Sequence, residues 1–207
     1  MRRNTRKICL LVAVFLMASC APVAPTVVEQ VPSPTSAPPI TQAFHPLDTR
    51  TGNEEIDNVL DTVASGNAQM LRSLVGFTTA ECTNQEGLGG PPKCREGEGE
   101  GTKVDVLPSL GPEGSFMRSD EMENWTGIEV SGLYAIYRVS PAVIYEQYYP
   151  AGEYAILYVG EEDRPAISLR IDNGMIVRVD YIFDTSAEYL AGLLQREASE
   201  LILEPIS

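Results

Sequence analysis

The sequence is short of histidine and of positive charge. Its only histidine is His45, and 15 Lys and Arg residues stand against 29 Asp and Glu residues, for a formal net charge of −14. A Ser-His-Asp or Cys-His catalytic arrangement needs a histidine beside its nucleophile, and none follows residue 45. A surface this acidic repels phosphate backbones, so we expect no nucleic-acid partner.

The apolar run near the N-terminus is too short to span a membrane comfortably. It covers residues 8–18, which is 11 residues, whereas a transmembrane helix needs about 20. A basic stretch at residues 2–7 precedes it, and the small residues Ala18 and Ser19 follow. This order of basic, apolar and small residues is typical of a signal peptide.

The residues Met17-Ala18-Ser19-Cys20 resemble the lipobox of bacterial lipoproteins, which reads roughly Leu-Ala-Gly/Ser-Cys, with methionine replacing the usual leucine. The resemblance implies that residues 1–19 are a lipoprotein signal peptide, and that the sulfur of Cys20 receives a diacylglyceryl group with palmitate-like chains. Each buried methylene contributes about 0.8 kcal/mol, so two or three chains anchor a protein stably in the lipid bilayer. We expect an extracytoplasmic domain, lipid-anchored to the cell membrane or outer membrane. An ordinary secretory peptide and an uncleaved anchor are the alternatives.

Residues 20–46 are rich in proline, mixed with threonine, serine, valine and alanine. Such a composition does not form a packed core, and it favours extended conformations of about 3 Å per residue. We interpret this segment as a disordered tether, which leaves residues 47–207 as one globular domain. Because the signal peptide holds four of the 15 basic residues and none of the 29 acidic ones, the mature chain would carry a net charge of −18.

Two cysteines remain for the domain once Cys9 leaves with the signal peptide and Cys20 carries lipid. They are Cys82 and Cys94, and an even pair in an oxidising compartment predicts a disulfide. Closing this loop contributes about 3 kcal/mol to stability. The glycines inside the loop do not form a phosphate-binding P-loop, because the prolines at 91–92 lack N–H donors. The loop is either a purely structural clamp or a rigid recognition surface, and without histidine we expect no metal site and no cofactor.

Apolar spacing predicts a helix over residues 53–66 and a shorter one starting at Asn67. We expect short strands at 77–82 and 102–107, a solvated Glu-Gly hinge between them at 96–101, and one or two helical turns at 119–125. Period-two alternation then predicts strands at 133–139, 153–159, 166–171 and 175–183, with a hairpin turn at residues 172–174. A final helix begins after Thr185 or Ser186, with inward residues Leu190, Leu193, Leu194, Ala198 and Leu201.

Helices followed by an antiparallel meander define an α+β fold. The order of elements over residues 53–184 resembles the cystatin-like and NTF2-like folds, in which a curved antiparallel sheet wraps an N-terminal helix to form a cone. The resemblance implies N-terminal helices packed on that sheet, with the C-terminal helix added to it. Members of this superfamily that act as isomerases, dehydratases or epoxide hydrolases use carboxylates and tyrosines at the mouth of the cone.

Asp180 is the candidate carboxylate for such chemistry, with Arg170 and Arg178 as neighbours. The apolar residues of the last strand alternate from Met175 to Phe183, so Arg178 and Asp180 are predicted to face solvent. An exposed ion pair between Arg170 and Asp180 is the simpler interpretation, and such a pair contributes only about 0–1 kcal/mol. We therefore assign no catalytic residue.

All nine tyrosines lie between residues 134 and 189. Tyrosine combines apolar area with a hydrogen-bonding tip, which suits ligand pockets and protein interfaces as well as β-strands. The candidates for contact with a ligand or partner are Trp125, Tyr145, Tyr148, Tyr149 and Asp180. The hypothesis is a membrane-anchored lipoprotein with a non-catalytic domain that binds a small ligand or an envelope protein. The alternatives are an NTF2-like isomerase or hydrolase and a structural or assembly lipoprotein.

Overall fold

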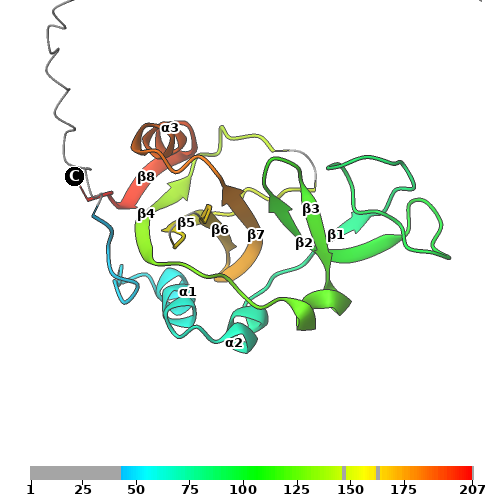
Figure 1. Ribbon diagram of the computed structural model, residues 1–207, viewed down its shortest axis with the longest axis horizontal. Helices are drawn as coiled ribbons and strands as arrows, with labels where there is room; N and C mark the ends of the chain where they lie inside the picture. Colours follow the sequence, from blue (N-terminus) through cyan, green and yellow to red (C-terminus); the bar gives the residue numbers. More distant parts are fainter. Residues whose placement is uncertain (1–42, 146–147, 162–163, 207) are drawn as a thin grey trace, which may run out of the picture. The chain divides into compact units, whose positions relative to one another are not determined.

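A computed structural model describes residues 43–145, 148–161 and 164–206 (Figure 1). Its helices are α1 (Glu54–Ala64), α2 (Ala68–Ser73), the 3-10 helix η1 (Ser119–Asn124) and α3 (Ala187–Glu197). Its strands are β1 (Thr78–Glu81), β2 (Lys103–Leu110), β3 (Ser115–Arg118), β4 (Gly132–Val139), β5 (Tyr154–Val159), β6 (Ala166–Asp172), β7 (Met175–Ile182) and β8 (Ala198–Leu203). The predicted signal peptide, Cys20 and most of the tether lie outside the described residues. No described helix is long and apolar enough to cross a membrane.

The eight strands form one sheet in the order β1-β2-β7-β6-β5-β4-β8, with β3 paired to β2. Neighbouring strands are antiparallel except β2 and β7, where Leu110 lies opposite Asp180 in a parallel pair. The predicted α+β class is therefore confirmed, but the expected fully antiparallel sheet is wrong at this one pair. Four strands, β3 to β6, separate β2 from β7 in the chain, so no hairpin sets their relative direction.

The helix α1 covers one face of the sheet, as its sequence predicts. The side chain of Asn53 accepts hydrogen bonds from the backbone N–H groups of Glu55 and Ile56, which satisfies donors that the first turn leaves free. The four apolar residues expected on one side of this helix are all buried: Ile56, Val59, Leu60 and Val63. They pack with buried residues of β4 to β7 and with Leu71 of α2 in one hydrophobic cluster.

The opposite face of the sheet is covered by α3. Leu190, Leu193 and Leu194 of this helix pack with buried residues of β4, β5, β6 and β7 in a second hydrophobic cluster. Figure 1 shows α1 and α2 on one side of the sheet and α3 on the other. The sheet therefore has two buried faces, whereas the alternation of apolar and polar residues in β7 predicts only one.

The last helix is shorter than predicted. It ends at Glu197, and the following residues form β8, an edge strand paired antiparallel with β4. The backbone N–H of Ser140 donates to the carbonyl of Glu197 at 2.7 Å at this junction. Helical spacing alone predicts that Leu201 lies on the inner side of a helix. In the structure, the backbone N–H and C=O groups of this segment find their partners by pairing with the free edge of β4 instead.

The two ends of the described chain meet beside β4. His45 exchanges two backbone hydrogen bonds of 2.9 Å with Leu133, and its ring nitrogen Nε2 lies 2.7 Å from the carbonyl oxygen of Glu204. Residues 43–46, which the sequence assigns to the tether, thus contact the domain (Figure 1). The chain that leads back to Cys20 joins the domain at the β4 and β8 end of the sheet.

Candidate functional site

The face of the sheet under α3 holds a cluster of charged residues. Arg170 on β6 lies directly opposite Arg178 on β7, and Asp180 follows two residues along β7. All three are buried, with Arg170 2% and Arg178 0% exposed. The prediction that Arg178 and Asp180 face solvent is wrong, because this face is covered by α3 and by residues 140–145 and 148–150, which we call the 140–150 segment.

Asp180 joins the two arginines. Its Oδ1 accepts from Nε of Arg178 at 2.7 Å, and its Oδ2 accepts from Nη2 of Arg178 at 2.8 Å and from Nε of Arg170 at 3.0 Å. The bidentate pair with Arg178 is a strong, charge-assisted contact. Without Asp180, two buried cations would face each other across paired strands, so this carboxylate makes their burial tolerable.

Glu197, the last residue of α3, compensates the second positive charge. Its Oε2 accepts from Nη2 of Arg170 and from the hydroxyl of Tyr137, the latter at 2.9 Å. Tyr145, from the 140–150 segment, accepts from Arg170 at 3.1 Å, and its ring centre lies 3.8 Å from Cζ of Arg178, a cation–π contact. The arginine cluster, which we define as Arg170, Arg178, Asp180 and Glu197, thus connects α3 and the 140–150 segment to the sheet.

Burial and charge act in opposite directions on the ionisable groups around this cluster. Burial raises the pKa of the Tyr137 hydroxyl well above its ordinary value, and burial likewise raises the pKa of Tyr145. Burial also disfavours the ionised form of Glu197, but the positive charge of Arg170 and its hydrogen bond outweigh that effect and lower the pKa of Glu197. At neutral pH the two tyrosines are therefore neutral and Glu197 is ionised.

The arginine cluster is better suited to structure than to proton transfer. Both of its carboxylates accept hydrogen bonds from arginines, so neither is free to take a proton from a substrate. Beside the cluster, Nη1 of Arg170 and the hydroxyl of Ser168 are buried without a hydrogen-bond partner among the described residues, as is the hydroxyl of Tyr158 elsewhere in the sheet. The two groups beside the cluster can donate to a bound water molecule, as buried polar groups commonly do.

The structure brings three of the predicted contact residues together. Tyr145 and Asp180 both contact Arg178, and the carbonyl oxygen of Tyr149 lies 3.3 Å from Nη1 of that arginine. Tyr148 is half-buried in the same segment as Tyr149. Trp125 lies apart from them, buried in the hydrophobic cluster under α1.

Tyr149 also packs against the turn between β2 and β3. Its ring centre lies 5.2 Å from that of Phe116, and a side chain at Gly114 would overlap its hydroxyl. This tyrosine is only 5% exposed. It therefore fastens the 140–150 segment to the β2–β3 hairpin and does not present a free aromatic surface.

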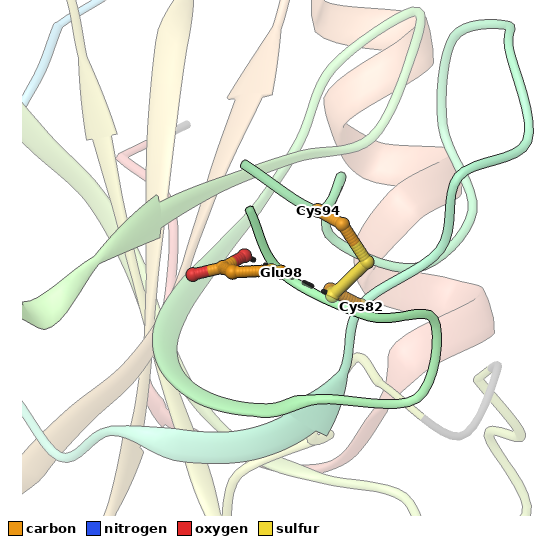
Figure 2. A group of neighbouring side chains, drawn as sticks. All are labelled: Cys82, Cys94 and Glu98. Carbon is orange, nitrogen blue, oxygen red and sulfur yellow. Dashed lines mark hydrogen bonds between the residues drawn. A yellow bond between two sulfur atoms is a disulfide. The ribbon is translucent and has the colours of Figure 1, made fainter. Parts of the chain in front are cut away.

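A second polar site lies at the other end of the sheet, in the loop between β1 and β2. The structure contains the predicted disulfide between Cys82 and Cys94, whose Cα atoms lie 4.9 Å apart (Figure 2). Backbone hydrogen bonds flank it: Thr83 donates to the carbonyl of Pro92 at 2.8 Å, and Cys94 donates to the carbonyl of Thr83 at 3.0 Å. We call residues 82–101 the clamped loop.

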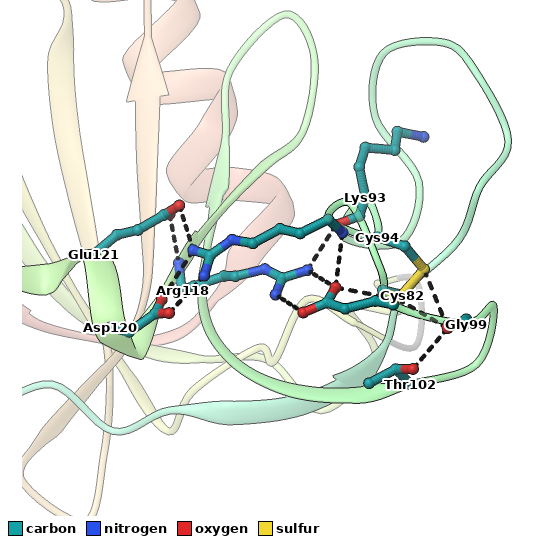
Figure 3. Close-up of polar contacts among 10 residues, drawn as sticks. Cys82, Lys93, Cys94, Gly99, Thr102, Arg118, Asp120 and Glu121 are labelled. Atoms are coloured by element: carbon teal, nitrogen blue, oxygen red, sulfur yellow. Dashed lines mark hydrogen bonds and ion pairs between the residues drawn. A yellow bond between two sulfur atoms is a disulfide. The ribbon is translucent and has the colours of Figure 1, made fainter.

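Glu98 fixes the second half of the clamped loop. Its two carboxylate oxygens accept from Nη1 and Nη2 of Arg118 at 2.6 and 2.7 Å, and Oε2 also accepts from the backbone N–H of Arg95 at 2.7 Å (Figure 3). Arg118 donates in addition to the carbonyl of Lys93 at 2.8 Å. The interpretation of residues 96–101 as a solvated hinge is therefore wrong for Glu98, which is held by a nearly buried arginine.

Arg95 extends this network to η1. Its guanidinium contacts Asp120 at 2.5 and 2.9 Å and Glu121 at 2.5 Å. Neither arginine could be predicted as part of this network, because Arg95 and Arg118 lie 23 positions apart and no local pattern relates them. The clamped loop is thus fixed by one covalent bond and by three arginine–carboxylate pairs.

An open groove of about 880 Å³ lies between the start of α1 and the β6–β7 turn. Glu54, Glu55, Asp57 and Asp61 line it together with Asn173. Asp57 accepts from the backbone N–H groups of Thr51 and Gly52, and Asp61 pairs with Arg50. Part of this acidic lining is thus used to position the segment before α1.

No family model, no curated protein and no solved structure matches the chain. The functional conclusion therefore rests on the residues themselves.

We predict that Asp180→Asn lowers the free energy of unfolding by about 3–5 kcal/mol, because it leaves two buried guanidinium groups without their shared carboxylate. The matched control is Asp172→Asn at the exposed end of β6, which should change stability by no more than about 0.5 kcal/mol. Urea unfolding of the two variants measures the difference. Equal stability of both variants would contradict the structural role of Asp180.

The stability of the clamped loop should depend on pH through Glu98. Its hydrogen bonds to Arg118 lower the pKa of Glu98 from 4.5 to about 2. A carboxylate with a lowered pKa in the folded state contributes stability that is fully present above the unfolded pKa and is lost as pH falls through the folded one. The stability advantage of the parent over Glu98→Gln should therefore shrink between pH 4.5 and about pH 2.

The control for this measurement is Glu96→Gln, a neighbouring exposed glutamate of the same loop. Its difference from the parent should stay nearly constant over this range. A Glu98→Gln difference that does not change with pH would show that the pair with Arg118 does not stabilise the loop.

Proposed function

We propose that the chain is an exported lipoprotein, held at the cell membrane or outer membrane by acyl chains on Cys20, with an extracytoplasmic domain. The observation that carries this proposal is the disulfide between Cys82 and Cys94, because such bonds persist in oxidising compartments outside the cytoplasm. The lipobox-like residues that end at Cys20 supply the export signal and the anchor. The disulfide and the lipobox-like residues, whose cysteines Cys82 and Cys20 are 62 positions apart in the sequence, both support a location outside the cytoplasm.

The domain is proposed to bind an envelope protein and to have no catalytic activity of its own. The face of the sheet under α1 is filled by fully buried side chains such as Ile56, Leu60 and Tyr158, which leaves little space for a small ligand there. On the other face, Asp180 is occupied by two arginines. This disfavours the alternative of an NTF2-like isomerase or hydrolase with Asp180 as its base.

The clamped loop is the proposed binding element. Leu88 at its tip is 79% exposed, while the disulfide and Arg118 fix the base of the loop, so a partner would not have to order it. The loop follows β1, whereas the chain leading back to Cys20 joins β4, five positions away in the sheet order. At about 4.8 Å per strand this separation along the sheet is roughly 24 Å, so residues 43–46 do not cover the loop.

The NTF2-like cone remains part of this proposal. Its support is the packing of α1 against the meander of β4 to β7, with residues of both in one hydrophobic cluster. In this interpretation the clamped loop is an insertion between the first two strands, and α3 with β8 is an addition at the end of the meander.

We predict that Cys20→Ser abolishes acylation. The parent chain expressed in its own host should incorporate labelled palmitate and lose residues 1–19, because the thiol of Cys20 is the acceptor for the lipid. The variant should incorporate no label and keep its leader, whereas the control Cys9→Ser should behave as the parent does. A parent chain that retains its leader and carries no acyl chain would refute the lipoprotein assignment.

A photo-reactive amino acid at position 88 should crosslink a second protein in intact envelopes, because Leu88 is exposed at the tip of a rigid loop. The control places the same amino acid at position 70, where Met70 on α2 is 49% exposed. We expect a discrete adduct from position 88 and none from position 70. No adduct at 88, or the same adduct at both positions, would count against the clamped loop as the binding element.

A further inference from the structure

We propose that the clamped loop contains a site for one thiophilic divalent cation, Zn²⁺, which becomes available when its disulfide is reduced. The ligands are the two thiolates of Cys82 and Cys94 and the carboxylate of Glu98. This inference concerns the loop alone and does not depend on the membrane anchor. Zinc would then replace the disulfide as the cross-link between the two cysteines.

The three ligand atoms are already close to one another. One oxygen of Glu98 and the two sulfurs all lie within 4.8 Å (Figure 2), and Oε2 of Glu98 is 3.9 Å from Sγ of Cys82. A tetrahedral zinc with bonds of about 2.3 Å to sulfur and about 2.0 Å to oxygen separates a sulfur from an oxygen by about 3.5 Å. The ligands therefore need to move by only a fraction of an ångström to about one ångström.

A fourth possible ligand, a backbone carbonyl oxygen, lies beside these three atoms. The carbonyl oxygen of Gly99 is 3.6 Å from Sγ of Cys82 and 3.5 Å from Sγ of Cys94 (Figure 3). These distances match the separation of ligands around a tetrahedral zinc. The fourth position can thus be taken by this carbonyl or by water.

The backbone around the cysteines does not rely on the disulfide alone. Cys82 donates its N–H to the carbonyl of Thr102 at 2.9 Å, and Cys94 donates to that of Thr83 at 3.0 Å. Glu98 is held by Arg118 and by the N–H of Arg95. All three ligands therefore stay near their positions when the bond between the sulfurs is broken.

The charges favour a divalent ion. Two thiolates and one carboxylate together exceed the charge of Zn²⁺ by one unit, and the guanidinium of Arg118, at 2.6 and 2.7 Å from Glu98, compensates that unit. Outer partners of this kind orient the ligands of a metal and tune its affinity. Thiolate ligands select zinc over the hard ions magnesium and calcium.

The chemical step is balanced by a dithiol reductant. The reductant transfers two electrons and two protons to the disulfide and leaves with its own disulfide, which produces the thiols of Cys82 and Cys94. Zinc then displaces one proton from each thiol and keeps its oxidation state.

The test uses the full-length chain carrying Cys9→Ser and Cys20→Ser, so that Cys82 and Cys94 are its only thiols. The chain is purified in detergent, reduced, freed of reductant without air and titrated with Co²⁺ and then Zn²⁺. We expect one Co²⁺ per chain with a thiolate-to-cobalt charge-transfer band, displaced by Zn²⁺, and no such band with the oxidised chain. Bound Zn²⁺ should also protect both thiols from alkylation.

Two matched variants separate the ligand role of Glu98 from general effects. Even outer partners of a metal contribute about 10-fold to 100-fold in affinity, so Glu98→Gln should weaken Zn²⁺ binding by at least about 10-fold. Glu96→Gln should leave it unchanged. Because Glu98→Gln also breaks the pair with Arg118, circular dichroism of the reduced variant confirms that it is folded, and the alkylation assay on the parent does not depend on any variant.

Either of two results would overturn the site. One is a reduced parent chain that shows no charge-transfer band and whose thiols react at the same rate with and without Zn²⁺. The other is equal Zn²⁺ affinity in the parent and in folded Glu98→Gln, which would show that Glu98 is not a ligand.

Discussion

The covalent bond between Cys82 and Cys94 is the strongest single constraint on the clamped loop, and backbone hydrogen bonds and the pair of Glu98 with Arg118 support it. The loop buries little apolar surface, with Leu88 pointing outward, so burial alone cannot hold it in one shape. A cross-link over a loop of this length stabilises the fold by about 3 kcal/mol, a large share of the 5–15 kcal/mol typical of a whole domain. Such bonds persist mainly in oxidising compartments, so the same bond supports the proposal that the chain is exported.

The arginine cluster allows the sheet to be covered on both faces. Arg170 and Arg178 are opposite each other and almost completely buried, which only the carboxylates of Asp180 and Glu197 make tolerable. Because α3 supplies Glu197 and the 140–150 segment supplies Tyr145, the cluster joins elements that are far apart in the sequence. Its charges are used to hold the domain together, and we propose the clamped loop as the element that binds a partner.

Features that depend on neighbouring residues could be predicted from the sequence, whereas contacts between elements that are far apart in the chain could not. The capped helix at 53–66, the turn at Asn173 and Gly174, and the disulfide follow from spacing and residue type, and the structure contains them. The burial of Asp180 could not be predicted, because alternation within one strand does not show that α3 covers its polar side. For the same reason helical spacing extended α3 through residues that pair with β4, and the partners of Glu98 lie on separate elements.

The central claim, that an exported and anchored chain carries an oxidised clamp, is tested most directly by the thiols of the protein taken from its own membrane. The native chain is denatured without reductant, treated with an alkylating reagent and weighed as an intact molecule. The account predicts a mass without residues 1–19, with acyl groups added at Cys20 and with Cys82 and Cys94 unalkylated and short of two hydrogens. Alkylation of both cysteines on a chain that still carries its leader would contradict it.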